Sequence, residues 1–459
     1  MARTVAVIGG GISGLAAAWE LSRPGTDVDV TLFEGSDRVG GKLRLEDVGG
    51  VRIDVGAESV LARRPEALAL IEELGISDRT THPAAVGASI VSRGARWPMP
   101  RGTVMGVPSD PESVRGLLSD EEVRRLADEI VDGPLVGDVS VGDLVDARLG
   151  AAVTDRLVEP LLAGVYAGHA REISAQQAVP VLAAAAREGR RLLDVAREVT
   201  ATAPTGPMAV LPVFATLVGG LGTLPEVLRH ELAAAGVHVR TAAVVRELHR
   251  DGRGWVVSTG PTTDVHRERF DAVVVATPAA PTARLIRDVA PAAAGALAEI
   301  EYASMAIITL ALDGPVPPLL DGSGFLVPPT EPLTIKASTF SSVKWPWLAG
   351  AHPHQTYLRA SIGRHREEAS LQRSDGELVE VALADLRAVL GPELPDPVAT
   401  HVQRWGGGLP PNAVGHGARL APTRELPSGL ALCGAAYDGV GIPACIASGR
   451  AAARAVLTR

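Results

Sequence analysis

Lysine, cysteine and aromatic residues are scarce in this chain of 459 residues. Lysine occurs only at Lys42, Lys336 and Lys344, and the formal net charge is -9. Nucleic-acid binding needs a clustered excess of basic side chains, so this charge argues against a DNA or RNA partner. The two cysteines, Cys433 and Cys445, form no C-x-x-C pair and belong to no His/Cys cluster. We therefore expect no metal site, no disulfide framework and a reducing compartment.

Long apolar runs are also missing. No uninterrupted apolar stretch reaches the ~18 residues that a membrane-spanning helix needs. The chain passes from Met1 almost directly into an apolar strand, so we expect no signal peptide. These absences predict a cytoplasmic protein, whereas peripheral contact with a membrane and the oligomeric state stay open.

A glycine-rich turn near the N-terminus is the first motif with a chemical meaning. It follows an apolar strand predicted over residues 4–8, precedes a helix predicted over residues 16–21, and satisfies G-x-G-x-x-G. In this context the first glycine allows the turn, the second lets the backbone approach a pyrophosphate, and the third permits close helix packing. The phosphates would lie at a helix N-terminus. The turn comprises Gly9, Gly10, Gly11, Ile12, Ser13 and Gly14.

Glu34 closes the next predicted strand, about 20 residues beyond the turn. A carboxylate there can accept hydrogen bonds from the hydroxyl groups of an adenosine ribose, which favours FAD or NAD over NADP. Arg38, Gly40 and Gly41 then supply a cation and two positions without side chains, which suits a second approach to the diphosphate. The alternative interpretations are a turn used only for packing and an R-x-G-G pattern that arose by chance.

The remaining patterns predict an α/β (α+β) chain with three units. We expect a discontinuous Rossmann-like dinucleotide-binding domain from residues 1–85, 205–300 and 395–459. An inserted mixed-sheet substrate-binding domain is expected from residues 86–112 and 301–394, and a helical subdomain from residues 113–204. The helical block opens with a capping box, Ser119 and Glu122, and should bury Val123, Leu126, Ala127 and Ile130 on one face. A strand, a glycine-rich turn and a helix over residues 430–457 should return the chain to the first domain.

The glycine turn, Glu34, residues 38–41, the strand end at residues 276–278 and the glycine-rich segment 434–443 together resemble the flavoproteins that include amine oxidases and phytoene desaturases. Within them, the chain is similar over nearly its whole length to the oxygen-dependent protoporphyrinogen and coproporphyrinogen oxidases. Four segments carry this likeness: EPLLAGVYAG at 159–168, FATLVGGLGTLP at 214–225, KWP at 344–346 and YDGVGIP at 437–443. The resemblance implies FAD as the cofactor, a porphyrinogen and O2 as substrates, and a role in haem biosynthesis.

The resemblance also implies which further positions contact FAD. Val244 could take the place of Val245 if the strand register slips by one residue, and Val245 or Trp405 could instead be part of the core. The further positions are Gly35, Lys42, Gly56, Ala57, Glu58, Ser59, Val245, Trp405, Val440, Gly441 and Ile442.

Glu58 bears on the choice of substrate, because similar enzymes of the mitochondrial type carry Arg at this position. The segment around Glu58 resembles the bacterial coproporphyrinogen branch instead. Coproporphyrinogen carries four propionates and protoporphyrinogen two, so its pocket should offer more cations. Arg64 fits best as a propionate contact, and Lys336 and Arg364 are further candidates; a solvated surface cation is the alternative for each.

The implied reaction oxidises coproporphyrinogen III to coproporphyrin III, with O2 as acceptor and hydrogen peroxide as by-product. Because the cofactor carries the redox chemistry, no catalytic side chain is assigned, and His169 and His416 are each expected to have a surface or structural role. A ferrochelatase could receive the product. Three alternatives remain: a protoporphyrinogen IX oxidase, a flavin amine oxidase or carotenoid desaturase, and a non-catalytic flavin-binding partner in haem assembly.

Overall fold

The computed structural model describes residues 2–202, 212–252 and 254–458. The chain opens with a βαβ unit made of β1 (Arg3–Ile8), α1 (Ile12–Leu21) and β2 (Val28–Phe33), with the two strands parallel. Side chains alternate along β1: Val5 and Val7 enter the core beneath α1, whereas Ala6 and Ile8 enter a second core on the other face. This double burial explains why β1 reads as a continuous apolar run.

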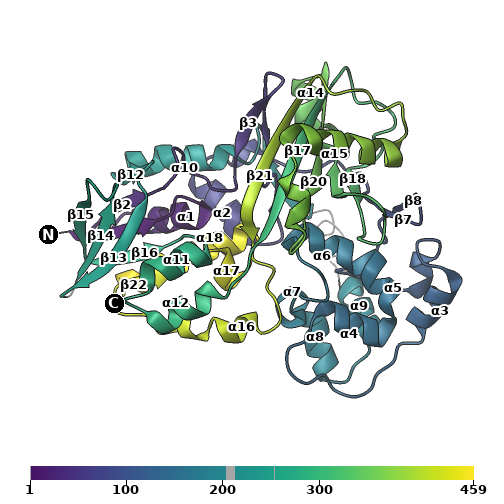
Figure 1. Ribbon diagram of the computed structural model, residues 1–459, viewed down its shortest axis with the longest axis horizontal. Coiled ribbons are helices and arrows are strands. Elements are labelled where there is room, and N and C mark those ends of the chain that lie inside the picture. The colour runs from purple at the N-terminus through teal and green to yellow at the C-terminus, as the bar shows by residue number, and fades with distance from the viewer. Residues whose placement is uncertain (1, 203–211, 253, 459) are drawn as a thin grey trace.

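A five-stranded parallel sheet grows around this unit, in the order β12-β2-β1-β16-β22. Its outer strands come from distant parts of the chain: β12 (His238–Arg240), β16 (Ala272–Val275) and β22 (Leu430–Leu432). The C-terminal helix α18 (Ile442–Leu457) packs against α1 so closely that a Cβ on Gly449 would lie 2.1 Å from the Ser13 carbonyl oxygen. The predicted return of the C-terminus is confirmed, and both chain ends lie on the same side of the molecule (Figure 1).

Two layers cover this parallel sheet. Beside α1 and α18, the helices α2 (Pro65–Glu73) and α10 (Thr223–Ala234) contribute to one core. The opposite core is closed by the antiparallel strands β13 (Val245–Asp251), β14 (Gly254–Thr259) and β15 (His266–Phe270), together with α11 (Ala279–Ile286) and α12 (Pro291–Ala298). Trp255 of β14 is fully buried there. The Rossmann-like arrangement predicted from the sequence is therefore confirmed.

A seven-stranded sheet forms the second unit. Its order is β21 (Ala399–Leu409), β17 (Ala303–Asp313), β20 (Gln355–Ile362), β19 (Ile335–Thr339), β18 (Gly324–Leu326), β7 (Ser89–Ser92) and β8 (Ala95–Pro98). Every neighbouring pair is antiparallel except β18 and β7, which makes the sheet mixed as predicted. Helix α15 (Asp375–Leu390) buries Leu378, Ala382 and Leu386 in its core. Two short helices, α13 (Ser341–Lys344) and α14 (Pro346–Ala351), precede β20.

The third unit is helical and lies next to β7 and β8, at one edge of the seven-stranded sheet (Figure 1). The capping box is confirmed, because Ser119 and Glu122 each bond the backbone of the other. Ile130, expected on the buried face, lies beyond the helix end at Asp128 and is 43% exposed, and Ala127 is also exposed. The helices are α3 (Asp120–Ala127), α4 (Val141–Leu149), α5 (Ala151–Val153), α6 (Glu159–Tyr166), α7 (Ala175–Ala178), α8 (Pro180–Arg187) and α9 (Leu192–Ala201), with a π-helical turn over Thr154–Val158.

Shorter elements connect the three units. Among the described residues, the helices are individually too short or too polar to cross a membrane. The strands are β3 (Leu45–Val48), β4 (Val51–Asp54), β5 (Val60–Leu61), β6 (Thr80–Thr81), β9 (Thr103–Val104), β10 (Val107–Pro108) and β11 (Phe214–Leu217); the helices are α16 (His416–Arg419) and α17 (Ala435–Asp438).

Strand pairing bears on the predicted domain boundaries. Residues 399–409 form β21, which pairs with β17 in the seven-stranded sheet. We therefore propose that the last segment of the FAD-binding domain begins after Leu409 rather than at residue 395. The predicted boundary between residues 204 and 205 lies outside the described residues.

Candidate cofactor and substrate site

A cavity of about 760 Å³ lies at the carboxyl ends of the parallel strands. Its walls include Ile8 at the end of β1 and the residues that follow the parallel strands: Gly9 after β1, Glu34 after β2, Ala276 after β16 and Gly434 after β22. Open parallel sheets bind their ligands at this edge, where the strand ends and the first turns of the following helices meet.

The glycine turn of residues 9–14 forms the floor of the cavity. Gly9 has φ +108°, and a Cβ on Gly14 would lie 1.9 Å from the Gly9 carbonyl oxygen, so both positions require glycine. Gly11 differs, because a Cβ there would meet no atom within 4 Å, and the residue lines the cavity. Ile12 and Ser13 line it as well. The turn therefore leaves a space at the N-terminus of α1 in which an anionic group fits.

Glu34 is held at the cavity edge by three hydrogen bonds. Gly10 N–H donates to Oε2 at 2.6 Å, and the backbone and hydroxyl groups of Ser36 both donate to Oε1 at 2.8 Å. An ionised carboxylate has about four acceptor sites, so one remains for a ribose hydroxyl. The adjacent Gly35 also lines the cavity.

Residues 38–42 form the wall next to the glycine turn. Gly40 N–H donates to the Gly10 carbonyl at 2.8 Å, and Gly40 and Gly41 have φ values of +114° and +56°. Gly41 and Lys42 line the cavity, and burial lowers the pKa of the Lys42 ammonium. The Arg38 guanidinium turns back toward the Val39 and Gly41 carbonyl oxygens, so the structure places this predicted contact beside the wall rather than on it.

The segment after β4 carries four predicted contacts and reaches the cavity through one of them. Ala57 lines the cavity and donates its N–H to the Lys42 carbonyl at 3.0 Å. A Cβ on Gly56 would lie 2.0 Å from the same oxygen, which explains the glycine. The Glu58 carboxylate instead bonds Lys344 at 2.6 Å and Arg359 at 3.0 Å, and Ser59 is half-buried. Ala57 is thus the member of this segment that could touch a cofactor directly.

The C-terminal segment closes the cavity from the opposite side. Gly439 has φ +119°, and Gly441 caps the N-terminus of α18 in an extended conformation. Val440 and Ile442 line the cavity. The N-termini of α1 and α18 therefore both face this space, as the glycine patterns at the two ends of the chain predicted.

The two positions with alternative interpretations have different surroundings. Val244 and Val245 both line the cavity, so the structure leaves the choice between them open. Trp405, on β21, donates its indole N–H to the Val55 carbonyl at 3.3 Å and lies against Gly56. Trp405 therefore supports the loop that carries Ala57.

Asp54, the last residue of β4, lies directly before this loop and was not predicted from the sequence. Its two carboxylate oxygens each accept a backbone hydrogen bond of 2.8 Å, from Leu221 and from Gly222. Burial raises the pKa of Asp54 to about 7, against the opposing effect of these N–H groups. The glycine-rich segment 219–222 is thereby fixed to β4 by a single carboxyl group.

The raised pKa of Asp54 predicts a pH effect on stability. The folded protein keeps the proton that the unfolded chain loses near pH 3.9, so this group's contribution to stability falls as pH rises from about 4 to about 7. The free energy of unfolding of the wild type minus that of Asp54→Asn should therefore decrease by roughly 4 kcal/mol across this pH range. Urea unfolding of both proteins at several pH values measures the difference, and a pH-independent difference would contradict the assignment.

The three predicted substrate contacts occupy unlike environments. Arg64 is the N-cap residue of α2, pairs with Glu66 and has a side chain that is 45% exposed. Lys336 and Arg364 are each only 5% exposed. Arg364 donates to the Val327 carbonyl at 2.9 Å, while Lys336 Nζ makes no hydrogen bond or ion pair with any described residue. Burial and then the charge of Arg364 lower the pKa of Lys336 to about 7.

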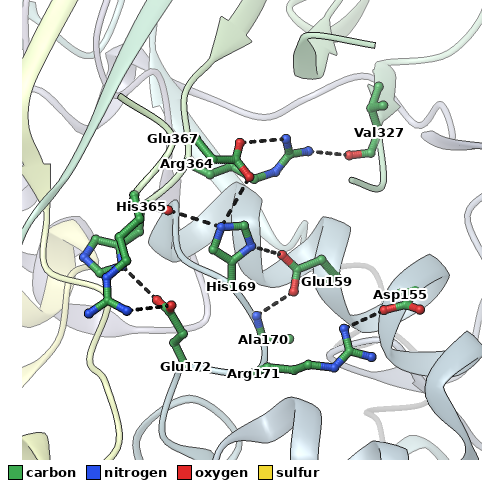
Figure 2. A network of polar contacts seen from close by, with 11 residues as sticks. Asp155, Glu159, His169, Ala170, Arg171, Glu172, Val327, Arg364, His365 and Glu367 are labelled. Carbon is green, nitrogen blue, oxygen red and sulfur yellow. Dashed lines mark hydrogen bonds and ion pairs between the residues drawn. The ribbon is translucent and has the colours of Figure 1, made fainter. Parts of the chain in front are cut away.

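A polar network joins Arg364 to the helical unit (Figure 2). The Glu367 carboxylate lies 3.6 Å from the Arg364 guanidinium and 3.4 Å from His169 Nε2. His169 Nδ1 contacts the buried Glu159 carboxylate at 3.1 Å. Next to it, His365 is buried and contacts Glu172 at 2.8 Å. His169 thus bridges Glu159 and Glu367 within this network. His416, also buried, contacts the Ala436 carbonyl at 2.7 Å.

The raised pKa of His169 predicts a second effect of pH on stability. Its hydrogen bond with Glu159 raises its pKa, with Glu367 and Glu172 adding to the effect against burial. Because the folded pKa lies above the unfolded value of about 6.5, the stabilisation is complete below pH 6.5 and is lost as pH rises through the folded value. The wild type should therefore be more stable than His169→Gln by a larger margin at pH 6 than at pH 9. Thermal unfolding at the two pH values tests this, and an equal margin would count against it.

Sequence reasoning also missed part of the cavity wall. Arg246 and Arg284 bring two cations to it from β13 and α11, and Tyr302 and Leu409 add larger side chains. These residues belong to no local motif, because the fold brings them to the cavity from separate elements. In this part of the sequence, the Thr277-Pro278 pair just after β16 was the only feature that indicated a contribution to the site.

Comparison with known proteins agrees with this geometry. The family model described as "Flavin containing amine oxidoreductase" matches residues 12–457. The coproporphyrinogen III oxidase of Mycobacterium tuberculosis (strain ATCC 25618 / H37Rv) is 39% identical, over 98% of this chain and 96% of that protein. The enzyme of the same name from Bacillus subtilis (strain 168) is 31% identical, over 99% and 98%.

A solved structure shares the whole architecture. The structure of a candidate protoporphyrinogen oxidase from Exiguobacterium sp. 255-15 superimposes with a TM-score of 0.87 at 30% identity, covering 100% of this chain and 99% of the other. The chain belongs to the flavin containing amine oxidoreductase family. It is therefore a flavin-dependent oxidoreductase, and the cavity between the glycine turn and α18 is the candidate flavin site.

Proposed function

We propose that the flavin is FAD and that those predicted residues that line the cavity hold it there. Three features support a dinucleotide: the space above Gly11, the Glu34 carboxylate with a free acceptor site, and two helix N-termini that face the same space. Glu34 would bind the adenosine ribose. Gly11, Gly41 and the two helix N-termini would hold the diphosphate, and Ala57, Val440 and Ile442 would line the ring system.

We further propose that the enzyme oxidises coproporphyrinogen III to coproporphyrin III with O2 as acceptor and hydrogen peroxide as by-product. The single observation that carries this proposal is the full-length similarity to proteins named coproporphyrinogen III oxidase. The buried cations Lys336 and Arg364 support it, because a substrate rich in carboxylates would supply the missing partner of Lys336. Arg64 would be an outer contact, since its side chain is partly in water.

When bound, FAD would supply the redox chemistry, which is hydride acceptance from the substrate and electron transfer to O2. The protein then has to bind the substrate, orient it and shield it from water. Lys336 and Arg364 would hold substrate carboxylates, which fixes the macrocycle's orientation. The apolar wall from Pro278, Leu285 and Tyr302 would exclude water. This division of labour accounts for a site in which we assign no nucleophile or general base.

The substrate is tested by comparing initial rates on coproporphyrinogen III and protoporphyrinogen IX, both prepared anaerobically and then mixed with enzyme and O2. We expect faster porphyrin formation from coproporphyrinogen III, with peroxide released in proportion. A preference for protoporphyrinogen IX would support the activity named for the Exiguobacterium relative. Formation of neither porphyrin nor peroxide would favour a non-catalytic flavin-binding partner.

Three further parts of the proposal concern the surroundings of the enzyme. We propose that it acts in the cytoplasm, since both cysteines are free and buried. Hand-over of the tetrapyrrole product to a ferrochelatase and peripheral contact with a membrane are the other two parts. Sedimentation with and without lipid vesicles would measure the membrane contact and the oligomeric state together.

A further inference from the structure

A partly buried group of charges lies behind the loop that carries Ala57. Glu58 belongs to this loop, Lys344 ends the short helix α13, and Arg359 lies on β20. Lys344 Nζ is 2.6 Å from one Glu58 oxygen, and an Arg359 nitrogen is 3.0 Å from the other. Their side chains are between 11% and 18% exposed, so all three charges are largely shielded from water.

Arg359 makes two more contacts with the same segment. One of its terminal nitrogens also donates to the Asp54 carbonyl at 3.1 Å, and the other donates to the Gly56 carbonyl at 3.0 Å. A single guanidinium therefore holds three points of residues 54–58. Ala57 lies between two of these points and lines the cavity. The seven-stranded sheet thus fixes the position of the cavity wall through Arg359.

The group has more positive than negative charge at neutral pH. Burial alone would raise the pKa of Glu58, but Lys344 and Arg359 outweigh it and hold this pKa at about 2, so Glu58 is fully ionised. Asp54, the other carboxyl group in this segment, is partly protonated because burial raises its pKa to about 7. Two cations therefore face one full carboxylate and one partial one.

Excess positive charge favours the more negative state of a neighbouring group. Transfer of a hydride to FAD brings two electrons and one proton, which adds one negative charge to the ring system. We propose that Lys344 and Arg359 are positioning residues that fix the Ala57 loop through Glu58 and whose excess charge makes the bound flavin a stronger oxidant. This inference rests on the proposed FAD site, and the substrate would supply the hydride.

The midpoint potential of the bound flavin tests this proposal. Lys344→Met removes one positive charge and should lower the potential, whereas Glu58→Gln removes the negative charge and should raise it. Each shift should correspond to a roughly tenfold change in the relative affinity for oxidised and reduced FAD, which is about 30 mV for a two-electron couple. Lys344→Arg keeps the charge and is the matched control, with an expected potential close to that of the wild type.

The opposite signs separate charge from structural damage. A change that merely loosened the loop would move both variants in the same direction, and that result, or no shift in either, would overturn the proposal. If Lys344→Met fails to fold, Glu58→Gln alone decides, because a potential at or below the wild-type value contradicts the proposed charge effect. A wild-type protein that binds no FAD would instead refute the proposed cofactor.

Discussion

Replacing Gly11 with Val is expected to abolish FAD binding while leaving the fold intact. Gly11 has φ -71° and ψ 175°, a conformation that any residue adopts, and a Cβ at this position would have no protein atom within 4 Å. The Val side chain would therefore enter the cavity without strain and fill the space where the diphosphate must approach. We expect at least a thousandfold weaker affinity, equivalent to about 4 kcal/mol.

Gly295→Val is the matched control for this change. Gly295 lies on the exposed surface of α12, and a Cβ there also meets no atom within 4 Å. Both variants should keep the wild-type far-ultraviolet circular dichroism spectrum, and the Gly295 variant should keep its flavin. Fluorescence titration of apoprotein with FAD measures the affinities. Wild-type affinity in Gly11→Val would show that the cofactor does not approach this turn.

Lys336→Met is expected to weaken substrate binding and at the same time to stabilise the protein. Lys336 is 5% exposed, and its Nζ bonds to none of the described residues. A hydrogen bond to a charged group is worth about 1.5–3 kcal/mol, so losing one to a substrate carboxylate should raise KM for coproporphyrinogen III about 10- to 100-fold. Removing a buried cation should raise the free energy of unfolding.

The pKa of Lys336 adds a pH dependence to this prediction. Because burial lowers it to about 7, the wild-type lysine loses its charge as pH rises through 7, and KM should rise with it. In Lys336→Met the KM should be high and free of this dependence. Arg229→Met, on the exposed side of α10, removes a surface cation and should leave KM unchanged. An unaltered KM in Lys336→Met would remove Lys336 from the substrate site.

Local geometry explains which parts of the site could be predicted from the sequence. A tight turn before a helix needs glycine where φ is positive or where two backbones touch, so Gly9 and Gly14 mark the site within six residues. The same holds for the turn before α18. The alternation in the strands and the capping box of α3 are likewise short-range patterns, which is why the Rossmann-like unit and the helical unit were predicted correctly.

Contacts between distant segments explain what could not be predicted. Glu58 matches a cofactor-binding motif, yet its carboxylate bonds Lys344, which lies 286 residues further along the chain. Asp54 binds backbone groups 167 and 168 residues away, and nothing in its local sequence indicates this. The residues of β21 were predicted within the last segment of the FAD-binding domain, but the strand pairs with β17 in the seven-stranded sheet.

We propose that the two ends of the chain close around one FAD molecule. The most direct test is to record the visible absorption spectrum of the purified protein and to identify the cofactor released on denaturation by mass spectrometry. We predict a yellow protein with a flavin spectrum and about one FAD per chain. A colourless protein that remains colourless after incubation with FAD would contradict the assignment of this cavity.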